Sequence, residues 1–356
     1  KIILDPEGMP LRLEKRERTI AEQIVEESML IANETVASYL RDSKNPSVYR
    51  IHEVPEPERL EMMRTVLSTF SLPVPTGDEV KPADFQKLLT LSQGTNAEAV
   101  VQTIALRSMQ QARYSTNNAG HFGLASACYT HFTSPIRRYP DLMVHRLIRQ
   151  YQQKGKLTEE EAQMSLSYHT IAADQASSRE RIAVEAERET DDLKKAQYML
   201  PFIGQPFPAR ITGITSFGLF VGLENGIEGL VHISLLTDDV YVFDEATYTM
   251  RGQHGGNIFR LGDPMEVTLA KVNTEKCEID FVPGVVESLS DLQHMMAVSA
   301  ERRHKNGGKK EETKRSWFAG AASGKKSKKN KKDKKMNKKG RGKKGKSRKG
   351  RKSKKK

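Results

Sequence analysis

Residues 131–142 read HFTSPIRRYPDL and mark the start of a helix. The first half of this motif disfavours helix, because the residue before a proline is pushed out of the helical region. Apolar residues at positions 142, 143, 144, 147 and 148 then have the spacing of one helix face. We therefore expect a helix whose N-cap is Ser134 and whose first helical residue is Pro135.

Two arginines, Arg137 and Arg138, would lie in the first turn of this helix. The helix dipole is positive at that end, which is unfavourable for a cation. A docked anion would explain both residues, because free backbone N–H groups and guanidinium forks bind phosphate. Pairing with acidic neighbours would explain them as well, and the motif alone leaves both interpretations open.

The positive charge of the chain lies in its C-terminal tail. Residues 301–356 hold 28 Lys and Arg but only four Asp and Glu, whereas the preceding 300 residues hold 30 Lys and Arg and 41 Asp and Glu. Two distant cysteines, Cys128 and Cys277, argue against a disulfide framework or a zinc site and favour a cytoplasmic location. No apolar run could cross a membrane, and no signal peptide is present. The chain begins with Lys1 in a strand-like segment, so we expect the C-terminal piece of a longer protein.

The first 200 residues predict mostly helices. Residues 2–13 predict a β-hairpin around a Pro and Gly turn. Thr19 and Glu22 form a capping-box pattern before a long helix, and Thr158 and Glu161 form another before the longest helical signal, which runs to about residue 200. Other helices are expected at residues 57–70, 83–92, 95–113 and 136–153. A loop is expected at 73–77 and an extended segment at 121–129. The first long helix should have an apolar face formed by Ile20, Ile24, Met29, Ile31, Val36 and Leu40.

From Phe207 the apolar pattern changes to a period of two. Five short strands separated by glycine-containing turns predict a small closed barrel of the OB kind. Phe217 and Phe220 flank a glycine, and His232 follows on the next strand. Exposed rings on such a barrel stack on unpaired bases, whereas buried rings would fill its core. The strands are expected at residues 207–214, 219–223, 229–233, 265–272 and 278–282.

Beyond about residue 285 the apolar periodicity ends, and from Gly307 the chain is mainly Lys, Gly, Ser and Asn. Such a composition cannot bury enough apolar surface to fold, so we expect disorder. A Lys-rich tail without opposing acidic blocks favours binding to nucleic acid over a merely solubilising role.

Four segments together identify a family. They are IVEESMLIAN at residues 24–33, HFTSPIRRYPDLMVHR at 131–146, EAERE at 185–189, and FGLFV with GIEGLVHIS at 217–221 and 226–234. In order and spacing they resemble the RNase II/RNB exoribonuclease family over residues 1 to about 285. The resemblance implies an α+β fold: a mostly helical C-terminal portion of an RNB catalytic domain at 1–203, an S1 RNA-binding domain with the OB-fold at 204–285, and a disordered Lys-rich tail at 286–356.

Members of this family degrade RNA processively from the 3′ end to nucleoside 5′-monophosphates, using Mg²⁺ held by a cluster of aspartates. By resemblance, Arg137 contacts the scissile phosphate region and Glu187 lies near the product nucleotide. Glu27, rather than Glu26, matches the glutamate near the ribose of the 3′-terminal nucleotide. The resemblance also implies that His131, Arg138 and Tyr139 shape the RNA channel and that Phe217, Phe220 and His232 stack on bases.

Two departures from the family pattern limit these expectations. No D-x-D-D arrangement occurs in the chain, since Asp191-Asp192 and Asp238-Asp239 are isolated pairs, so we expect the Mg²⁺ ligands upstream of this chain. Glu278 stands where these barrels often carry a basic residue, which weakens the case for RNA contact at that edge. We expect the chain alone to lack hydrolytic activity but to bind RNA.

The expected partners are single-stranded and structured RNA, with ribosomes as a further contact of the basic tail, and the expected state is a monomer. The alternative function is a non-catalytic RNA-binding module associated with translation or ribosomes. The motif at 131–142 favours the enzyme, because a pure binding protein needs no phosphate-holding helix start followed by a carboxylate fifty residues later.

Overall fold

A computed structural model describes residues 1–14, 18–72, 80–95 and 97–305, with side chains up to residue 302. The predicted loop at 73–77 and the tail from residue 306 onward lie outside the described residues. The fold contains both helices and strands, as the α+β class requires: helices dominate up to residue 199, and strands follow. None of the helices in these ranges is long and apolar enough to cross a membrane.

The N-terminal hairpin and the first capping box are confirmed. Strands β1 (Ile2–Leu4) and β2 (Pro10–Leu13) pair in antiparallel fashion. Helix α1 (Ile20–Asp42) begins with a reciprocal capping box between Thr19 and Glu22. The start of this helix is therefore specified by its local sequence, because the backbone N–H groups of Thr19 and Glu22 each donate to the side chain of the other residue.

The apolar periodicity of α1 predicts the helix correctly, but most of its apolar face is not buried. Leu40 is fully buried, whereas Ile20, Ile24 and Ile31 are 76%, 62% and 64% exposed. The buried side of α1 instead includes a polar residue, Asn33, which is 3% exposed. The packing of α1 thus depends on one polar contact, described below, as well as on apolar burial.

Helices α2 (Pro57–Thr69), α3 (Pro82–Ser92) and α4 (Glu98–Ser108) match three predicted helices. Helix α4 ends five residues earlier than expected, because the chain turns extended at Met109. It then forms strand β4 (Arg113–Ser115), which pairs with β3 (Tyr49–Ile51) in a two-stranded sheet that the sequence did not predict. The prediction that residues 121–129 are extended is wrong, because these residues contain a 3₁₀ turn, η1 (Phe122–Leu124).

Helix α5 (Tyr139–Lys154) begins later than the sequence predicts. Ser134 is not its N-cap and Pro135 is not its first residue; the N-cap position is Arg138, and Pro140 lies in the first turn. Residues 135–137 form a turn instead. The predicted start was wrong because the chain before α5 is held by tertiary contacts, not by a cap of its own.

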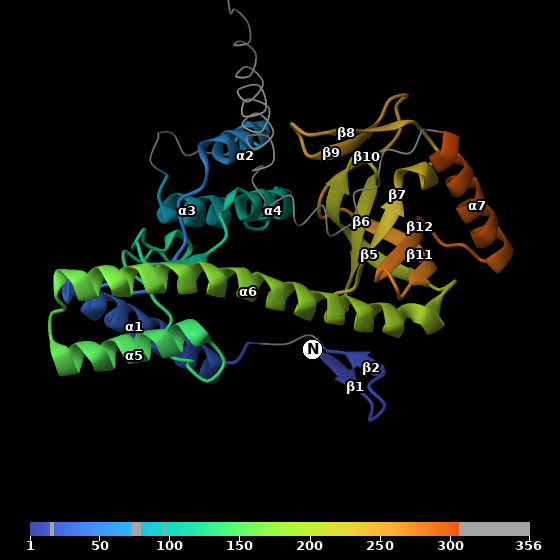
Figure 1. Ribbon diagram of the computed structural model, residues 1–356. Coiled ribbons are helices and arrows are strands. Elements are labelled where there is room, and N and C mark those ends of the chain that lie inside the picture. Colours follow the sequence, from blue (N-terminus) through green and yellow to red (C-terminus); the bar gives the residue numbers. More distant parts are fainter. Residues whose placement is uncertain (15–17, 73–79, 96, 306–356) are drawn as a thin grey trace, which may run out of the picture. The chain divides into compact units, whose positions relative to one another are not determined.

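Helix α6 (Glu159–Met199) is one unbroken helix of 41 residues, about 60 Å long. Its predicted capping box between Thr158 and Glu161 is confirmed. Figure 1 shows α5 alongside α6, and α5 also packs on α1, where Leu40 joins Val144 and Leu147 in one apolar cluster. The helix ends at a short 3₁₀ segment, η2 (Leu200–Phe202), and the barrel follows.

The predicted barrel is confirmed. Five strands close in the order β11-β12-β7-β6-β5, in which β7 and β12 are parallel and the other neighbours antiparallel. Alternate residues point inward, and Leu219, Val221 and Val231 are fully buried. The strands are β5 (Pro206–Thr215), β6 (Gly218–Leu223), β7 (Glu228–His232), β11 (Pro264–Asn273) and β12 (Glu278–Pro283).

An additional sheet, absent from the sequence prediction, lies between β7 and β11 in the chain. It consists of β8 (Tyr241–Asp244), β9 (Thr249–Gly252) and β10 (Ile258–Phe259). The carboxylate of Asp239 organises its loop by accepting hydrogen bonds from the backbone of Val240, His254 and Gly256. Burial raises the pKa of Asp239, but a hydrogen bond with the His254 ring and, after it, these backbone bonds hold the pKa well below its usual range.

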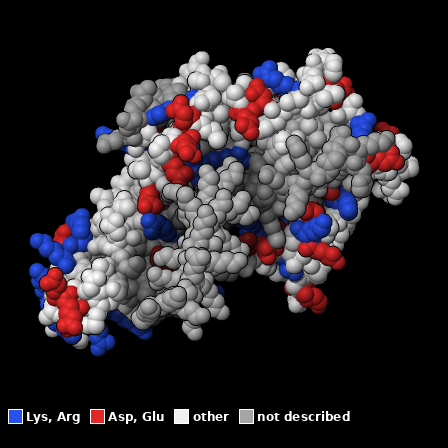
Figure 2. Space-filling model, turned by 45° about the horizontal axis from the view of Figure 1, so that its top comes forward, with Lys and Arg blue, Asp and Glu red and all other residues white. Residues whose placement is uncertain are grey.

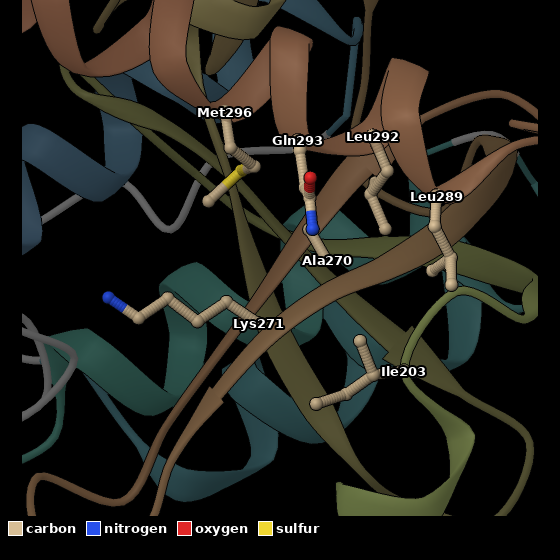
Figure 3. A pocket seen from close by; sticks show the side chains of 7 residues that line it. All are labelled: Ile203, Ala270, Lys271, Leu289, Leu292, Gln293 and Met296. Carbon is tan, nitrogen blue, oxygen red and sulfur yellow. The ribbon is translucent and has the colours of Figure 1, made fainter.

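The chain after the barrel is not a tail throughout. Residues 286–356 were expected to be disordered, but helix α7 (Leu289–Lys305) forms at their start. The prediction was wrong here because Leu292, 4% exposed, packs against Leu235 and Val282 of the barrel. Figure 3 shows α7 side chains around a cavity of about 260 Å³ against β11. Disorder from residue 306 onward stays a prediction, since those residues are not described.

Candidate functional site

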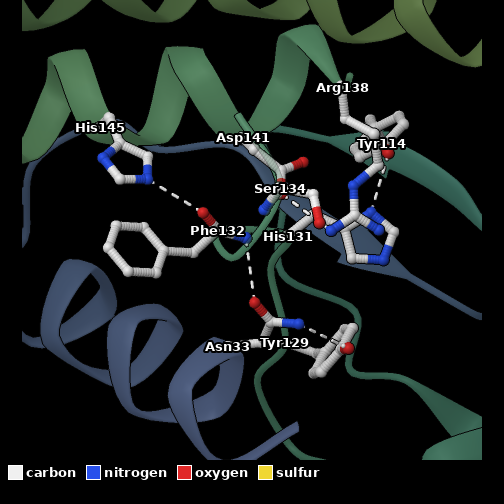
Figure 4. A network of polar contacts seen from close by, with 9 residues as sticks. All are labelled: Asn33, Tyr114, Tyr129, His131, Phe132, Ser134, Arg138, Asp141 and His145. Carbon is white, nitrogen blue, oxygen red and sulfur yellow. Dashed lines mark hydrogen bonds and ion pairs between the residues drawn. The ribbon is translucent and has the colours of Figure 1, made fainter. Parts of the chain in front are cut away.

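The turn before α5 is held by one buried carboxylate (Figure 4). Oδ1 of Asp141, whose side chain is 0% exposed, accepts a hydrogen bond from the backbone N–H of Ser134 at 2.8 Å. The same oxygen accepts a second bond from Nη2 of Arg138, also at 2.8 Å. Asp141 therefore closes residues 134–138 into a fixed loop at the start of the helix.

Helix α1 holds the other end of the motif through Asn33. The side-chain amide of Asn33 donates to the hydroxyl of Tyr129 at 2.9 Å, and its oxygen accepts from the backbone N–H of Phe132 at 3.0 Å. His145 adds a third restraint, because its ring stacks on Phe132 at 4.1 Å and its Nε2–H donates to the Phe132 carbonyl at 2.9 Å. The motif is thus fixed from both α1 and α5.

His131 lies among aromatic rings inside this network. Its Nδ1 is 2.8 Å from the hydroxyl of Tyr114, and its ring is edge-on to the rings of Tyr114 and Tyr129. Burial and, after it, the positive charges of Arg138 and Arg50 together lower the pKa of His131 to about 3. His131 is therefore neutral at physiological pH and acts here as a hydrogen-bonding ring, not as a cation.

The two arginines of the motif have different environments. The guanidinium of Arg138 is 24% exposed and pairs with Asp141, so the acidic-neighbour interpretation is correct for Arg138. Arg137 is exposed on the turn, and within the described part of the chain no ion pair involves its guanidinium. Of the two, only Arg137 presents a whole guanidinium fork to an incoming anion.

The predicted carboxylates lie on other helices. On α1, Glu26 pairs with Arg18, whereas Glu27 is exposed and forms no ion pair with any described residue. On α6, Glu187 is also exposed. Hydrogen bonds and ion pairs between described residues do not link Arg137, Glu27 and Glu187 to one another. Tyr139, 48% exposed, is the first residue of α5, two positions after Arg137.

The barrel brings together the three rings predicted to stack on RNA. Gly218 pairs with His232 across β6 and β7, and the rings of Phe217 and Phe220 meet edge-on at 6.0 Å. Phe217 is half-buried, but Phe220 is 4% and His232 8% exposed. The three rings thus form one cluster, but Phe220 and His232 are buried in it, as the alternative interpretation expects, and only Phe217 offers a partly open ring.

The described residues do not fit a magnesium site. No group of three His, Cys, Asp or Glu side chains among them could hold a metal ion. In Asp141, the carboxylate of the motif, Oδ1 accepts from Ser134 and Arg138, whereas the buried Oδ2 has no hydrogen-bond partner among the described residues, and no second carboxylate joins it in a metal-binding group. On the face drawn in Figure 2, acidic and basic side chains are interspersed, with no single large patch of one sign visible among the described residues.

Sequence reasoning missed Asp141 and Tyr114 as members of this site. Asp141 had a usable signal, because it lies three residues after Arg138, where helical neighbours pair. Tyr114 had none, since its contact with His131 depends on how β4 is placed. Asn33 ends the family segment at residues 24–33, and the structure gives it two partners, Tyr129 and Phe132.

Comparisons with known proteins agree with this architecture. The RNB domain family matches residues 1–154, and the S1 RNA binding domain family matches residues 200–282. Ribonuclease R 1 of Lactococcus lactis is 44% identical over 282 residues, which cover 79% of this chain and 34% of that protein. The solved apo form of Mycoplasma genitalium RNase R matches with a TM-score of 0.73 and 28% identity, covering 80% of this chain and 45% of that one.

A second solved structure is Mycoplasma genitalium RNase R in complex with ribose methylated single-stranded RNA, with a TM-score of 0.71, 28% identity and the same coverages of 80% and 45%. The chain thus spans about a third of the Lactococcus protein and under half of the Mycoplasma one. In this chain the RNB match is followed by the S1 match. The chain belongs to the RNB family, as a relative of bacterial ribonuclease R that carries an S1 RNA-binding domain.

Proposed function

We propose that this chain is the RNA-holding part of a 3′→5′ exoribonuclease that hydrolyses RNA processively to nucleoside 5′-monophosphates. The observation that carries the proposal is the exposed guanidinium of Arg137, which pairs with no carboxylate among the described residues, on a turn fixed by the buried Asp141. A rigid backbone with a free arginine fork is suited to a phosphate whose position must be kept during reaction. The similarity to ribonuclease R supports the same assignment.

Each site residue has a role in this proposal. Arg137 contacts the scissile phosphate, Glu27 the ribose of the 3′-terminal nucleotide, and Glu187 the product nucleotide. Arg138 acts indirectly, because its pair with Asp141 shapes the turn that presents Arg137. His131 and Tyr139 belong to the wall of the RNA channel.

The S1 barrel supplies a second RNA contact in this proposal. Phe217, Phe220 and His232 lie together, and base stacking on such rings is worth roughly 1–3 kcal/mol per base. The solved relative in complex with single-stranded RNA supports RNA as the ligand. On the basis of the sequence, we also propose that the enzyme acts on structured RNA. We propose as well that it is cytoplasmic and monomeric.

Magnesium chemistry needs residues outside the described part of the chain. Mg²⁺ takes hard oxygen ligands, activates the attacking water and stabilises the charge on the phosphate, and no suitable cluster occurs among the described residues. We therefore propose that the chain by itself is inactive. Purified chain with Mg²⁺ and uniformly labelled single-stranded RNA should retain RNA and release no mononucleotides; mononucleotide release would contradict the proposal.

The alternative, a non-catalytic module associated with translation or ribosomes, makes a different prediction for Arg137. A longer protein that contains the whole RNB domain separates the two functions. If the enzyme proposal is correct, Arg137→Ala abolishes turnover there while the barrel still binds RNA. A longer protein that binds RNA and ribosomes but never hydrolyses RNA would favour the alternative.

The Lys-rich tail lies outside the described residues, and its role is proposed from sequence alone. Removing residues 306–356 should weaken RNA binding and make it less dependent on salt, because fewer phosphate counterions are released. Binding to ribosomes, measured by co-sedimentation of the same two proteins, would show whether the tail has a second partner. Hydrolysis of unstructured RNA by the longer protein should survive the deletion.

A further inference from the structure

Helix α7 packs on the end of the barrel where the predicted stacking rings lie. Its contacts are with η3 (Ile233–Leu235), the short turn that follows His232, and with β11. Leu292 of α7 is buried between Leu235 and Val282, and Figure 3 shows Leu292 and Met296 projecting from the helix toward β11. The helix after the barrel is therefore built onto the same corner as His232.

A chain of hydrogen bonds runs from α7 to the ring of His232. Ser299 of α7 is 1% exposed, and its Oγ lies 2.5 Å from Oγ of Ser234. Oγ of Ser234 lies 2.7 Å from Nδ1 of His232. Two short contacts thus connect a buried serine of the helix to a ring predicted to contact RNA.

The direction of this chain follows from a third contact. The backbone N–H of Ser234 donates to Nδ1 of His232 at 3.1 Å, so this nitrogen is an acceptor and carries no proton. The hydroxyl of Ser234 then donates to the same nitrogen, and the hydroxyl of Ser299 must donate to Ser234. The imidazole is held as the neutral tautomer with its proton on Nε2, in one orientation.

Arg302 lies at the same corner. Its Nη1 donates to the backbone carbonyl of Ser234 at 3.2 Å, and the residue is exposed. A guanidinium carries five N–H donors, so one bond to a carbonyl leaves others for a phosphate. The guanidinium of Arg302 thus contacts a residue, Ser234, that lies two positions after His232.

We propose that α7 is part of the RNA-binding surface of the barrel: Ser299 positions the His232 ring through Ser234, and Arg302 binds the phosphate of the nucleotide that stacks there. Phe217 belongs to the same surface, because its carbonyl accepts from the backbone N–H of Ile233 at 2.9 Å. The inference rests on the proposed RNA binding by the barrel and adds a helix to it. The ligand is a single-stranded nucleic acid, recognised by one stacked base and one phosphate.

The positioning role is tested by a double-mutant cycle in RNA affinity. The purified chain is titrated against fluorescein-labelled oligoadenylate by anisotropy, at a salt concentration that suppresses binding by the tail. Ser299→Ala should weaken binding about fivefold, the value of one lost hydrogen bond, and Ser299→Thr, which keeps the hydroxyl, should bind more tightly than Ser299→Ala. In a His232→Ala background, Ser299→Ala should cause no further loss, because its effect passes through that ring.

The phosphate role is tested by salt dependence. Arg302→Gln should weaken binding and lower the slope of log affinity against log salt by about 0.7, the value for one phosphate contact on a single strand. Two matched controls should behave as wild type. Ser290→Ala changes an exposed residue in the first turn of α7. Lys276→Gln changes an exposed residue just before β12, at the end of the barrel opposite His232.

The outcomes separate this inference from the proposal on which it rests. If His232→Ala binds oligoadenylate as tightly as wild type, the barrel does not use this ring, and the proposed function of the barrel is wrong. If His232→Ala weakens binding but Ser299→Ala does not, or weakens it equally in both backgrounds, only the positioning role is wrong. An unchanged salt slope in Arg302→Gln overturns the phosphate contact. Unfolding curves of each variant show whether a loss of RNA affinity comes from unfolding. If Ser299→Ala unfolds, the affinity of Ser299→Thr, which keeps the hydroxyl, tests the positioning role instead.

Discussion

The guanidinium of Arg138 donates to the buried carboxylate of Asp141 at 2.8 Å, while the adjacent Arg137 has no ion-pair partner among the described residues. Two neighbouring arginines of one motif thus have separate tasks. Arg138 is used within the fold, and Arg137 is the residue that we propose for the phosphate. This division explains why the motif carries two arginines where the helix dipole would favour none.

In a longer protein that contains the whole RNB domain, Arg137→Lys should lower kcat by about a hundredfold, because an ammonium cannot make the forked contact with a phosphate. Steady-state hydrolysis of labelled single-stranded RNA measures this effect. The matched control is Arg149→Lys, an exposed arginine on α5, which should leave kcat unchanged. Unchanged turnover in Arg137→Lys would rule out the forked contact.

Glu187→Gln in the same longer protein should slow turnover with little change in RNA affinity, because the proposed contact is with the product nucleotide only. Single-turnover rates and anisotropy titrations separate the two quantities. Glu185→Gln, two residues away on the exposed surface of α6, is the control. A large loss of affinity with normal turnover would contradict the assigned role of Glu187.

Asp141→Ala should lower the free energy of unfolding by about 3 kcal/mol, because it leaves Arg138 partly buried without its partner. Urea denaturation of the purified chain measures this difference. Asp42→Ala is the control, since Asp42 pairs with Arg41 on the surface and such pairs contribute little. Equal losses in the two variants would show that the Arg138–Asp141 pair has no special weight.

Asn33→Ala should cost roughly 1–3 kcal/mol, because the hydroxyl of Tyr129 and the N–H of Phe132 both lose their partner in a buried setting. Tyr129→Phe removes only one of these bonds and should cost less. Thr35→Ala, exposed on the same helix, should be close to neutral. If Asn33→Ala unfolds at the same urea concentration as wild type, α1 does not fix the motif through this amide.

The stability of the chain should fall as the pH drops below about 6.5. Burial lowers the pKa of His121 to about 4 and that of His131 to about 3 from an ordinary 6.5, so the unfolded chain takes up protons first. Each histidine should cost roughly 1 kcal/mol between pH 6.5 and about pH 5, allowing for partial exposure. Urea denaturation at the two pH values measures this loss.

The effect of pH has its own control. His131→Gln should reduce the loss of stability, whereas His254→Gln, on an exposed ring, should not. A pH dependence unchanged by His131→Gln would show that another group is responsible.

Local signals predicted the parts of this fold that local interactions determine. The capping boxes at Thr19 and Thr158 form as their sequences indicate, and the period-two segments become the barrel strands. The start of α5 was wrong because a buried carboxylate, Asp141, holds Ser134 by its backbone and not by its side chain. A local cap rule has no knowledge of such a contact.

The candidate site was predicted as a set of residues but not as an arrangement. Asn33 and Tyr129 are 96 positions apart, and a single sequence offers no signal that joins them. Helix α7 was missed for a similar reason: it is stabilised by packing on the barrel. The hydrogen-bonded chain from Ser299 to His232 likewise depends on this packing.

The exposed row of Ile20, Ile24 and Ile31 on α1 has a consequence for the life of this polypeptide in a cell. Three branched apolar side chains on one helix face, each more than 60% exposed, are an unusual burden for an isolated chain. We expect the chain expressed by itself to be recognised by chaperones and proteases and to self-associate at high concentration. Its abundance would then be governed by protein quality control before it ever meets RNA.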